Sequence, residues 1–177
     1  MTARRSATRG SHSQPTEQDI PEFNLDRGTP ESAKQFEELD LFTQAYIEAV
    51  FWTETEPGTS RHIEPGERDV WLWQPEIHSS LPGDVDIADL SEETWAEMVD
   101  DCLKFQSSLA WVKAEIDQPV GNLSAQGGHD FWLTRNSHGA GFWDGDWPEP
   151  YATQLTEAAK EFGEFNLYLG DDGRIYS

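Results

Sequence analysis

Residues 129–146, with the sequence HDFWLTRNSHGAGFWDGD, constrain the fold of this chain more than any other stretch. Two apolar-aromatic runs, 131–133 and 142–143, flank the polar, glycine-containing segment 136–139. Such a pair of runs around a short polar link is typical of a β-hairpin. We therefore predict a hairpin whose side chains Phe131, Leu133, Phe142 and Trp143 are largely buried, with Trp132 at least half buried. Replacing a core Trp143 with alanine would then cost about 3–5 kcal/mol.

The remaining patterns predict one α+β domain over residues 29–177, preceded by a disordered tail at 1–28 that is poor in apolar residues. Strand-like segments at 165–170 and 174–176 surround the turn sequence Asp171-Asp172-Gly173. Together with the 129–146 hairpin they would form a small, mainly antiparallel sheet, which two or three helices would cover.

Three helices are expected. The first begins at Thr29-Pro30 and ends near 52–55, and the third covers about 150–162. Ser91 caps the second and longest helix, which continues to about residue 116. Its predicted buried stripe recurs at spacings of three and four residues: Trp95, Met98, Val99, Cys102, Phe105, Leu109, Val112 and Ile116.

Two segments between these elements have no regular pattern. Residues 56–83 form a long, irregular, proline-containing insertion around the Trp71-Leu72-Trp73 island, and 118–128 is a glycine-rich loop. If Trp71 and Trp73 are exposed, they would anchor an interface with a partner. If they are buried, they would attach the insertion to the body of the domain.

The charge of the chain is strongly unbalanced, with 12 Lys and Arg against 34 Asp and Glu, a net charge of −22. Such a chain repels nucleic acids and anionic membranes. It attracts basic proteins, or it imitates the charge of a nucleic acid and so occupies the binding surface of a nucleic-acid-binding protein. The same acidity also fits plain solubility or adaptation to salt. The single cysteine excludes an intrachain disulfide and fits a cytoplasmic location.

The acids concentrate between residues 84 and 101, where eight occur without a base. Those on the second helix lie opposite its apolar stripe and predict an exposed ridge. Residues 92–101 span ~15 Å of helix and carry five acids, whereas a DNA duplex of the same length carries about nine phosphates. To match the charge density of DNA, a second acidic element would have to add to the ridge. Glu37, Glu38 and Asp40 are candidates for that element. The predicted partner-binding residues are Asp84, Asp86, Asp89, Glu93, Glu97, Asp100 and Asp101, with Trp71 and Trp73.

The sequence holds no recognisable catalytic or cofactor motif. Zinc or iron ligands were sought among His129, Asp130, His138, Asp144 and Asp146, but no established ligand spacing is present, and the two histidines would lie at opposite ends of the hairpin. The loop 144–146 lacks the complete calcium-binding pattern. Cys102 lies on an apolar stripe, as a small hydrophobic residue does. We therefore expect no metal, no cofactor and no catalytic residue.

The segments GHDFWLTRN (128–136), HGAGFWD (138–144) and LYLGDDG (167–173) resemble a group of small, uncharacterised proteins from phages, prophages and plasmids. The resemblance implies a mobile-element origin and assigns no catalytic residue. Acidity and resemblance together favour a phage protein that binds and inhibits a host DNA-handling defence protein. The alternatives are an enzyme with a His/Asp site on the 129–146 hairpin, and an accessory protein whose acidity serves solubility or salt adaptation.

Overall fold

A computed structural model describes residues 25–56, 80–117 and 123–177, and in these residues the fold is mainly helical. The predicted α+β class is therefore wrong. The longer elements are the helices α1 (Pro30–Glu37), α2 (Leu41–Glu54), α3 (Glu92–Gln106), α4 (Leu109–Asp117), α5 (Leu123–Arg135) and α6 (Tyr151–Lys160). The shorter ones are the 3-10 turn η3 (Ile87–Asp89) and the strands β1 (Tyr168–Leu169) and β2 (Ile175–Tyr176).

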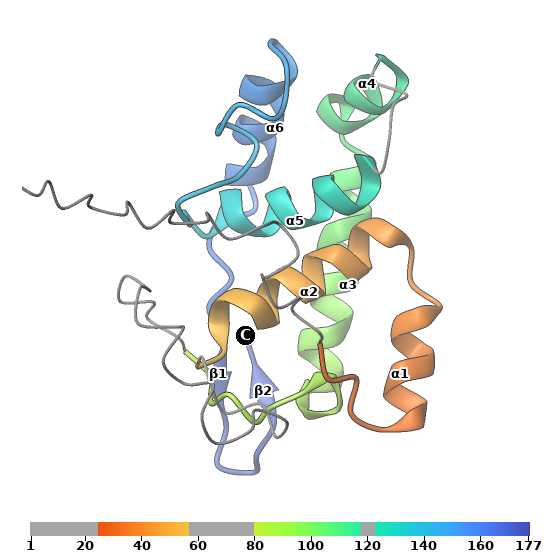
Figure 1. Ribbon diagram of the computed structural model, residues 1–177, viewed down its shortest axis with the longest axis vertical. Helices are drawn as coiled ribbons and strands as arrows, with labels where there is room; N and C mark the ends of the chain where they lie inside the picture. Colours follow the sequence, from red (N-terminus) through yellow and green to blue (C-terminus); the bar gives the residue numbers. More distant parts are fainter. Residues whose placement is uncertain (1–24, 57–79, 118–122) are drawn as a thin grey trace, which may run out of the picture.

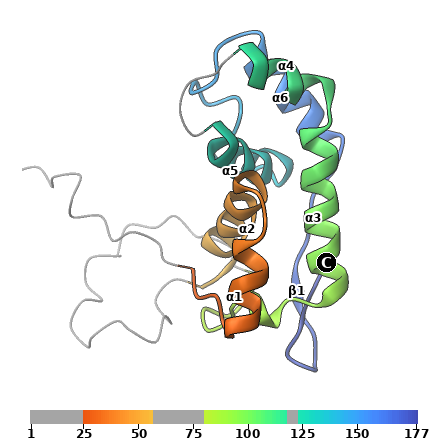
Figure 2. The ribbon, with the colours of Figure 1, turned by 90° about the vertical axis from the view of Figure 1, so that its right-hand side faces the viewer.

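Helices α2 and α5 pack side by side at the centre of the molecule (Figure 1). Helix α3 runs along one flank, while α4 and α6 lie together at one end (Figure 2). The two strands and α1 lie toward the other end (Figures 1 and 2). The core is aromatic: Phe105 stacks on Phe131 with ring centroids 4.2 Å apart, and Phe42 meets Trp111 edge-on at 4.9 Å.

The predicted hairpin at 129–146 is wrong, because residues 123–135 form α5 and residues 136–150 form an irregular loop. The last six residues of α5, 130–135, are all buried. A helix that is buried on every side has no polar face, so its apolar run lacks the helical period and resembles a strand. Residues 123–128, predicted as loop, are the first turns of the same helix.

Both long predicted helices are interrupted by a polar cap. Asp40 accepts hydrogen bonds from the backbone N–H groups of Phe42 and Thr43, so a new helix begins there and the first prediction splits into α1 and α2. The second splits into α3 and α4 at Ser107-Ser108, where the Ser108 hydroxyl accepts from Trp111 N. The predicted caps Thr29 and Ser91 are confirmed.

Burial agrees with only part of the sequence prediction. Phe131, Trp132, Leu133 and Phe142 are buried as predicted. The predicted burial of Trp143 is wrong, because this side chain is 54% exposed, and the core-sized truncation cost that depended on its burial no longer applies. Met98, Cys102 and Phe105 are buried in the α3 stripe. Beyond the break the stripe turns outward, since three of its predicted members are exposed: Leu109, Val112 and Ile116.

The C-terminal strand pair is confirmed in reduced form. β1 and β2 are antiparallel, pair Tyr168 with Tyr176, and enclose the predicted turn at 171–173. They form a sheet of two short strands rather than the layer expected. Most of the predicted tail and insertion, including Trp71 and Trp73, lies outside the described residues. No helix in the described ranges is both long enough and apolar enough to cross a membrane.

Candidate functional site

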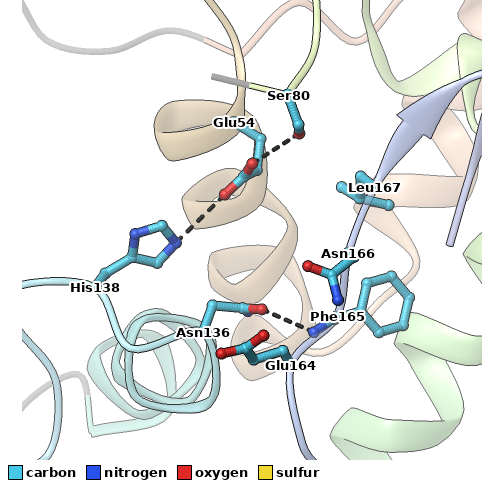
Figure 3. Close-up of a pocket in the computed structure, with 8 residues that line it drawn as sticks. All are labelled: Glu54, Ser80, Asn136, His138, Glu164, Phe165, Asn166 and Leu167. Carbon is cyan, nitrogen blue, oxygen red and sulfur yellow. Dashed lines mark hydrogen bonds and ion pairs between the residues drawn. The ribbon is translucent and has the colours of Figure 1, made fainter. Parts of the chain in front are cut away.

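A polar hollow of about 190 Å³ lies where the end of α2 meets the loops that follow α5 and α6 (Figure 3). Glu54 is the last residue of α2, His138 follows α5, and Ser80 opens the second described range. The wall opposite is formed by the segment after α6. The lining is Glu54, Ser80, Asn136, His138, Glu164, Phe165, Asn166 and Leu167.

Glu54 is the best-connected side chain of this hollow. Its Oε1 lies 3.3 Å from His138 Nε2, and its Oε2 accepts a 2.7 Å hydrogen bond from the Ser80 hydroxyl. The His138 nitrogen is buried and within ion-pair distance, yet its contact is not aligned as a hydrogen bond. Burial alone would raise the pKa of Glu54, but the contacts with His138 and Ser80 outweigh it, so the pKa lies below its ordinary value.

A histidine beside a carboxylate is a possible proton-transfer pair. Here, however, the Ser80 hydroxyl bonds to the carboxylate rather than to the imidazole, which is not the arrangement of a nucleophilic triad. The side-chain amide of Asn136 already has structural partners: its Oδ1 accepts a hydrogen bond from Phe165 N, and its Nδ2 donates one to the Trp132 carbonyl. The hollow therefore holds an acid–base pair without an activated nucleophile among the described residues.

The lowered pKa of Glu54 predicts a specific pH dependence of stability. A carboxyl whose pKa is lower folded than unfolded stabilises the fold above the unfolded value, near 4.5, and this contribution is lost as pH falls through the folded value. Glu54→Gln should therefore lose stability relative to the parent at pH 7, and the difference should shrink below about pH 4. Urea unfolding at both pH values measures it.

The matched control is Glu56→Gln, which removes an exposed carboxylate two residues farther along the chain. Because other carboxylates titrate equally in parent and variant, the difference between them isolates Glu54. An unchanged difference at pH 7 and at low pH would contradict the role given to this side chain.

A second hollow, of about 360 Å³, shares Glu164, Phe165 and Asn166 with the first and has Arg135 and Asp101 in its wall. The Arg135 side chain is 2% exposed. Its guanidinium donates to Asp101 Oδ2 at 2.9 Å, to the Tyr46 hydroxyl at 2.9 Å, and to the carbonyls of Gly163 and Phe162. These contacts join α5 to Asp101 on α3, to Tyr46 on α2 and to the segment that follows α6, so Arg135 holds three parts of the fold against α5.

The remaining polar residues of the 129–146 block are separate from the hollow. Asp130 accepts a 2.6 Å hydrogen bond from Trp147 Nε1, and His129 Nδ1 lies 3.5 Å from the same carboxyl group. The His129 ring also lies against that of Trp52. Asp144 accepts from the backbone N–H groups of Gly141 and Asp146, as a turn residue does. In the described parts of the chain, no three His, Cys, Asp or Glu side chains gather as metal ligands would.

The predicted ridge is only partly exposed. Glu93, Glu97 and Asp100 face solvent, but the Asp101 side chain is 14% exposed and neutralised by Arg135. The expectation that Asp101 points away from the core is therefore wrong. Asp100 lies against Lys104 in an i,i+4 ion pair, and Glu97 accepts from the Ser177 hydroxyl.

The other predicted acids have local roles. Asp86 caps η3 through Ala88 N, and Asp89 accepts in return from Asp86 N; Asp84 is exposed. The proposed second acidic element is also engaged, since Glu37 pairs with Arg27, Glu38 pairs with Lys34, and Asp40 caps α2. Most of these contacts are local in sequence, as caps or i,i+4 pairs, and only the pair of Arg27 with Glu37 joins residues ten positions apart.

Neither a family model, nor a curated protein, nor a solved structure matches this chain.

Proposed function

We propose that this protein binds a basic, DNA-handling protein of a host through its acidic surface and inhibits it without catalysis. The observation that carries the proposal is the outer face of α3, where Glu92, Glu93, Glu97 and Asp100 are exposed. The side chains of the opposite face, Met98, Cys102 and Phe105 among them, are buried and hold the helix in place. The acids are thus presented on a fixed scaffold.

The pairing of the acids decides how this surface would act. Lys104 forms an ion pair with Asp100, which leaves Glu92, Glu93 and Glu97 as the acids of this face that form no ion pair within the described residues. A duplex carries one charge per ~1.7 Å, or about seven over the ~12 Å between residues 92 and 100. Helix α3 alone is too sparse to reproduce that density. The proposal is therefore one of general attraction to a basic surface, with DNA imitation requiring acids from other elements.

The net charge of −22 supplies a long-range field that speeds encounter with a basic partner. The resemblance to phage and plasmid proteins favours a host defence protein that handles DNA as the partner. Exposed acids also occur outside α3, on α1 and in the loops, for example Glu31, Asp146, Glu161 and Asp171. That spread equally suits a protein whose acidity serves solubility, and the test must separate the two.

We expect neutralisation of the α3 face to weaken partner binding by about tenfold, since each exposed ion pair contributes roughly 0.2–1 kcal/mol. The test protein is a DNA-binding protein captured from host lysate and then purified. Displacement of a fluorescent duplex from it is measured at increasing salt, which should weaken the effect steeply. The variant combines Glu92→Gln, Glu93→Gln, Glu97→Gln and Asp100→Asn, and leaves Asp101 unchanged because it is part of the core.

The control removes the same number of exposed acids elsewhere, through Glu31→Gln, Asp146→Asn, Glu161→Gln and Asp171→Asn. The two variants have equal net charge, so only a defined acidic surface distinguishes them. Equal displacement by parent and both variants would refute the proposal and leave solubility as the reason for the acidity. Equal losses would assign binding to total charge rather than to α3.

A further inference from the structure

Helix α4 is apolar on two opposite faces. Trp111 and Ala114 are buried against the core. Leu109 and Ile116 are 69% and 70% exposed, and Val112 between them is 38% exposed. Because a helix turns 100° per residue, positions 109, 112 and 116 fall on one stripe, which lies opposite the two buried side chains.

The cause is the break between α3 and α4. The apolar spacing continues across residues 107–108, but the Ser107 and Ser108 caps end one helix and begin the next. This change of direction buries Trp111, whose ring meets Phe42 and Phe105. The same change of direction exposes three aliphatic side chains, Leu109, Val112 and Ile116, which we call the α4 stripe.

We propose that the α4 stripe is the docking site for a basic amphipathic helix of the partner protein. This inference rests on the proposed function and identifies the apolar anchor of the same interaction. Apolar side chains at this spacing are recognised by a second helix with apolar residues at i, i+3 or i+4, and i+7.

The size of the α4 stripe argues against a second copy of this chain as the occupant. At the exposures given above, its three side chains present on the order of 300 Å², the lower end of the range for the largest apolar patch on a monomer. A stable protein dimer buries about 800 Å² on each partner. Two copies would also each carry the charge of −22, and their mutual repulsion would oppose association.

Charge argues for a basic occupant. Glu115 and Asp117 are exposed on α4, against the one base of this helix, Lys113. Helix α6 packs beside α4, and the Tyr151 hydroxyl donates a hydrogen bond to Asp117. Helix α6 presents the exposed Glu157 and the exposed Lys160, so the two helices together carry three exposed acids and two exposed bases within a chain of net charge −22. A helix with apolar anchors and Lys or Arg on its flanks would match both the α4 stripe and its surroundings.

The test uses the full chain and a synthetic helical peptide with leucines at i, i+3 and i+7 and lysines on both flanks. A second peptide has the same composition in scrambled order, and a third carries Glu in place of Lys. We expect the first peptide to bind at least tenfold more tightly than either of the others. Leu109→Gln with Ile116→Gln should remove that tenfold preference and leave the melting temperature unchanged, because both side chains are largely exposed.

Leu41→Gln is the matched control, since Leu41 is a 56% exposed leucine outside the α4 stripe. If the scrambled peptide binds as well as the amphipathic one, or if the double variant binds both as the parent does, the docking site is wrong. Two other outcomes would also overturn it. One is a parent dimer in sedimentation that the double variant does not form; the other is binding of the parent, but not of the double variant, to neutral lipid vesicles.

The α3-neutralised variant separates this inference from the proposed function. If it loses the basic peptides while the α4 double variant keeps them, the acidic surface is supported and the α4 docking site is refuted. If neither variant loses binding, both proposals fail.

Discussion

Gly128→Ala is expected to destabilise the protein by about 3 kcal/mol or more, the upper part of the range for overpacking. A Cβ at this position would lie 1.9 Å from the Phe42 carbonyl oxygen and 3.0 Å from Tyr46 N, both backbone atoms of α2. Neither atom can rotate away, so the two central helices would have to separate. Helix propensity predicts the opposite sign, since alanine is favoured over glycine by about 1 kcal/mol within a helix.

Chemical denaturation of parent and variant measures this effect, and Gly139→Ala is the control. A Cβ on Gly139 would meet no atom within 4 Å, so its replacement should change stability by about 0.5 kcal/mol or less. A Gly128→Ala variant that is as stable as the parent, or more so, would show that α2 and α5 do not cross this closely.

Gly128 and its neighbour Gly127 explain why the central helix α5 was not predicted from the sequence. In the sequence, Gly127 and Gly128 indicate a loop, because glycine weakens an isolated helix. In the folded protein, Gly127 faces the Trp111 ring and Gly128 faces the α2 backbone, so the absence of side chains permits the close crossing. Periodicity could not correct the error, since residues 130–135 are buried on all sides. A central helix of this kind is specified by its neighbours.

Helix caps and turns were predicted better than the central helix. The caps Thr29 and Ser91 and the turn at 171–173 were predicted correctly, because each depends on a few adjacent residues. The caps Asp40 and Ser108 were present in the sequence as the same kind of signal, but the continuing apolar spacing outweighed them. Reading these two caps as helix starts would have predicted both breaks.

The candidate site was less predictable than the fold. His138 was considered only as a metal ligand and within the alternative His/Asp site on the 129–146 hairpin, whereas its partner Glu54 is 84 positions earlier and was one of many acids on the first predicted helix. Asp101 was assigned to the solvent face from its position on the helix. Its pairing with Arg135 depends on how α5 packs against α3, which no pattern within either segment indicates.

Arg135→Met should cost about 3–5 kcal/mol, the range for removing one partner of a buried ion pair. The loss includes four hydrogen bonds of its guanidinium and the stacking of that group near the rings of Phe131, Phe162 and Phe165, at 5.0–5.7 Å. The largely buried Asp101 would lose the cation beside it. Tyr46 cannot replace the guanidinium, because a phenol carries no positive charge; burial raises its pKa, so it stays neutral.

Urea unfolding of a double-mutant cycle tests this explanation. Arg135→Met with Asp101→Asn should be less destabilised than the sum of the two single variants, because neutralising Asp101 removes the orphaned charge. Arg174→Met is the matched control: Arg174 is exposed and its guanidinium donates to the carbonyls of Ala88 and Leu90, so loss of this side chain should cost about 1 kcal/mol. Strict additivity in the cycle would mean that Arg135 stabilises the fold through its aromatic and carbonyl contacts alone.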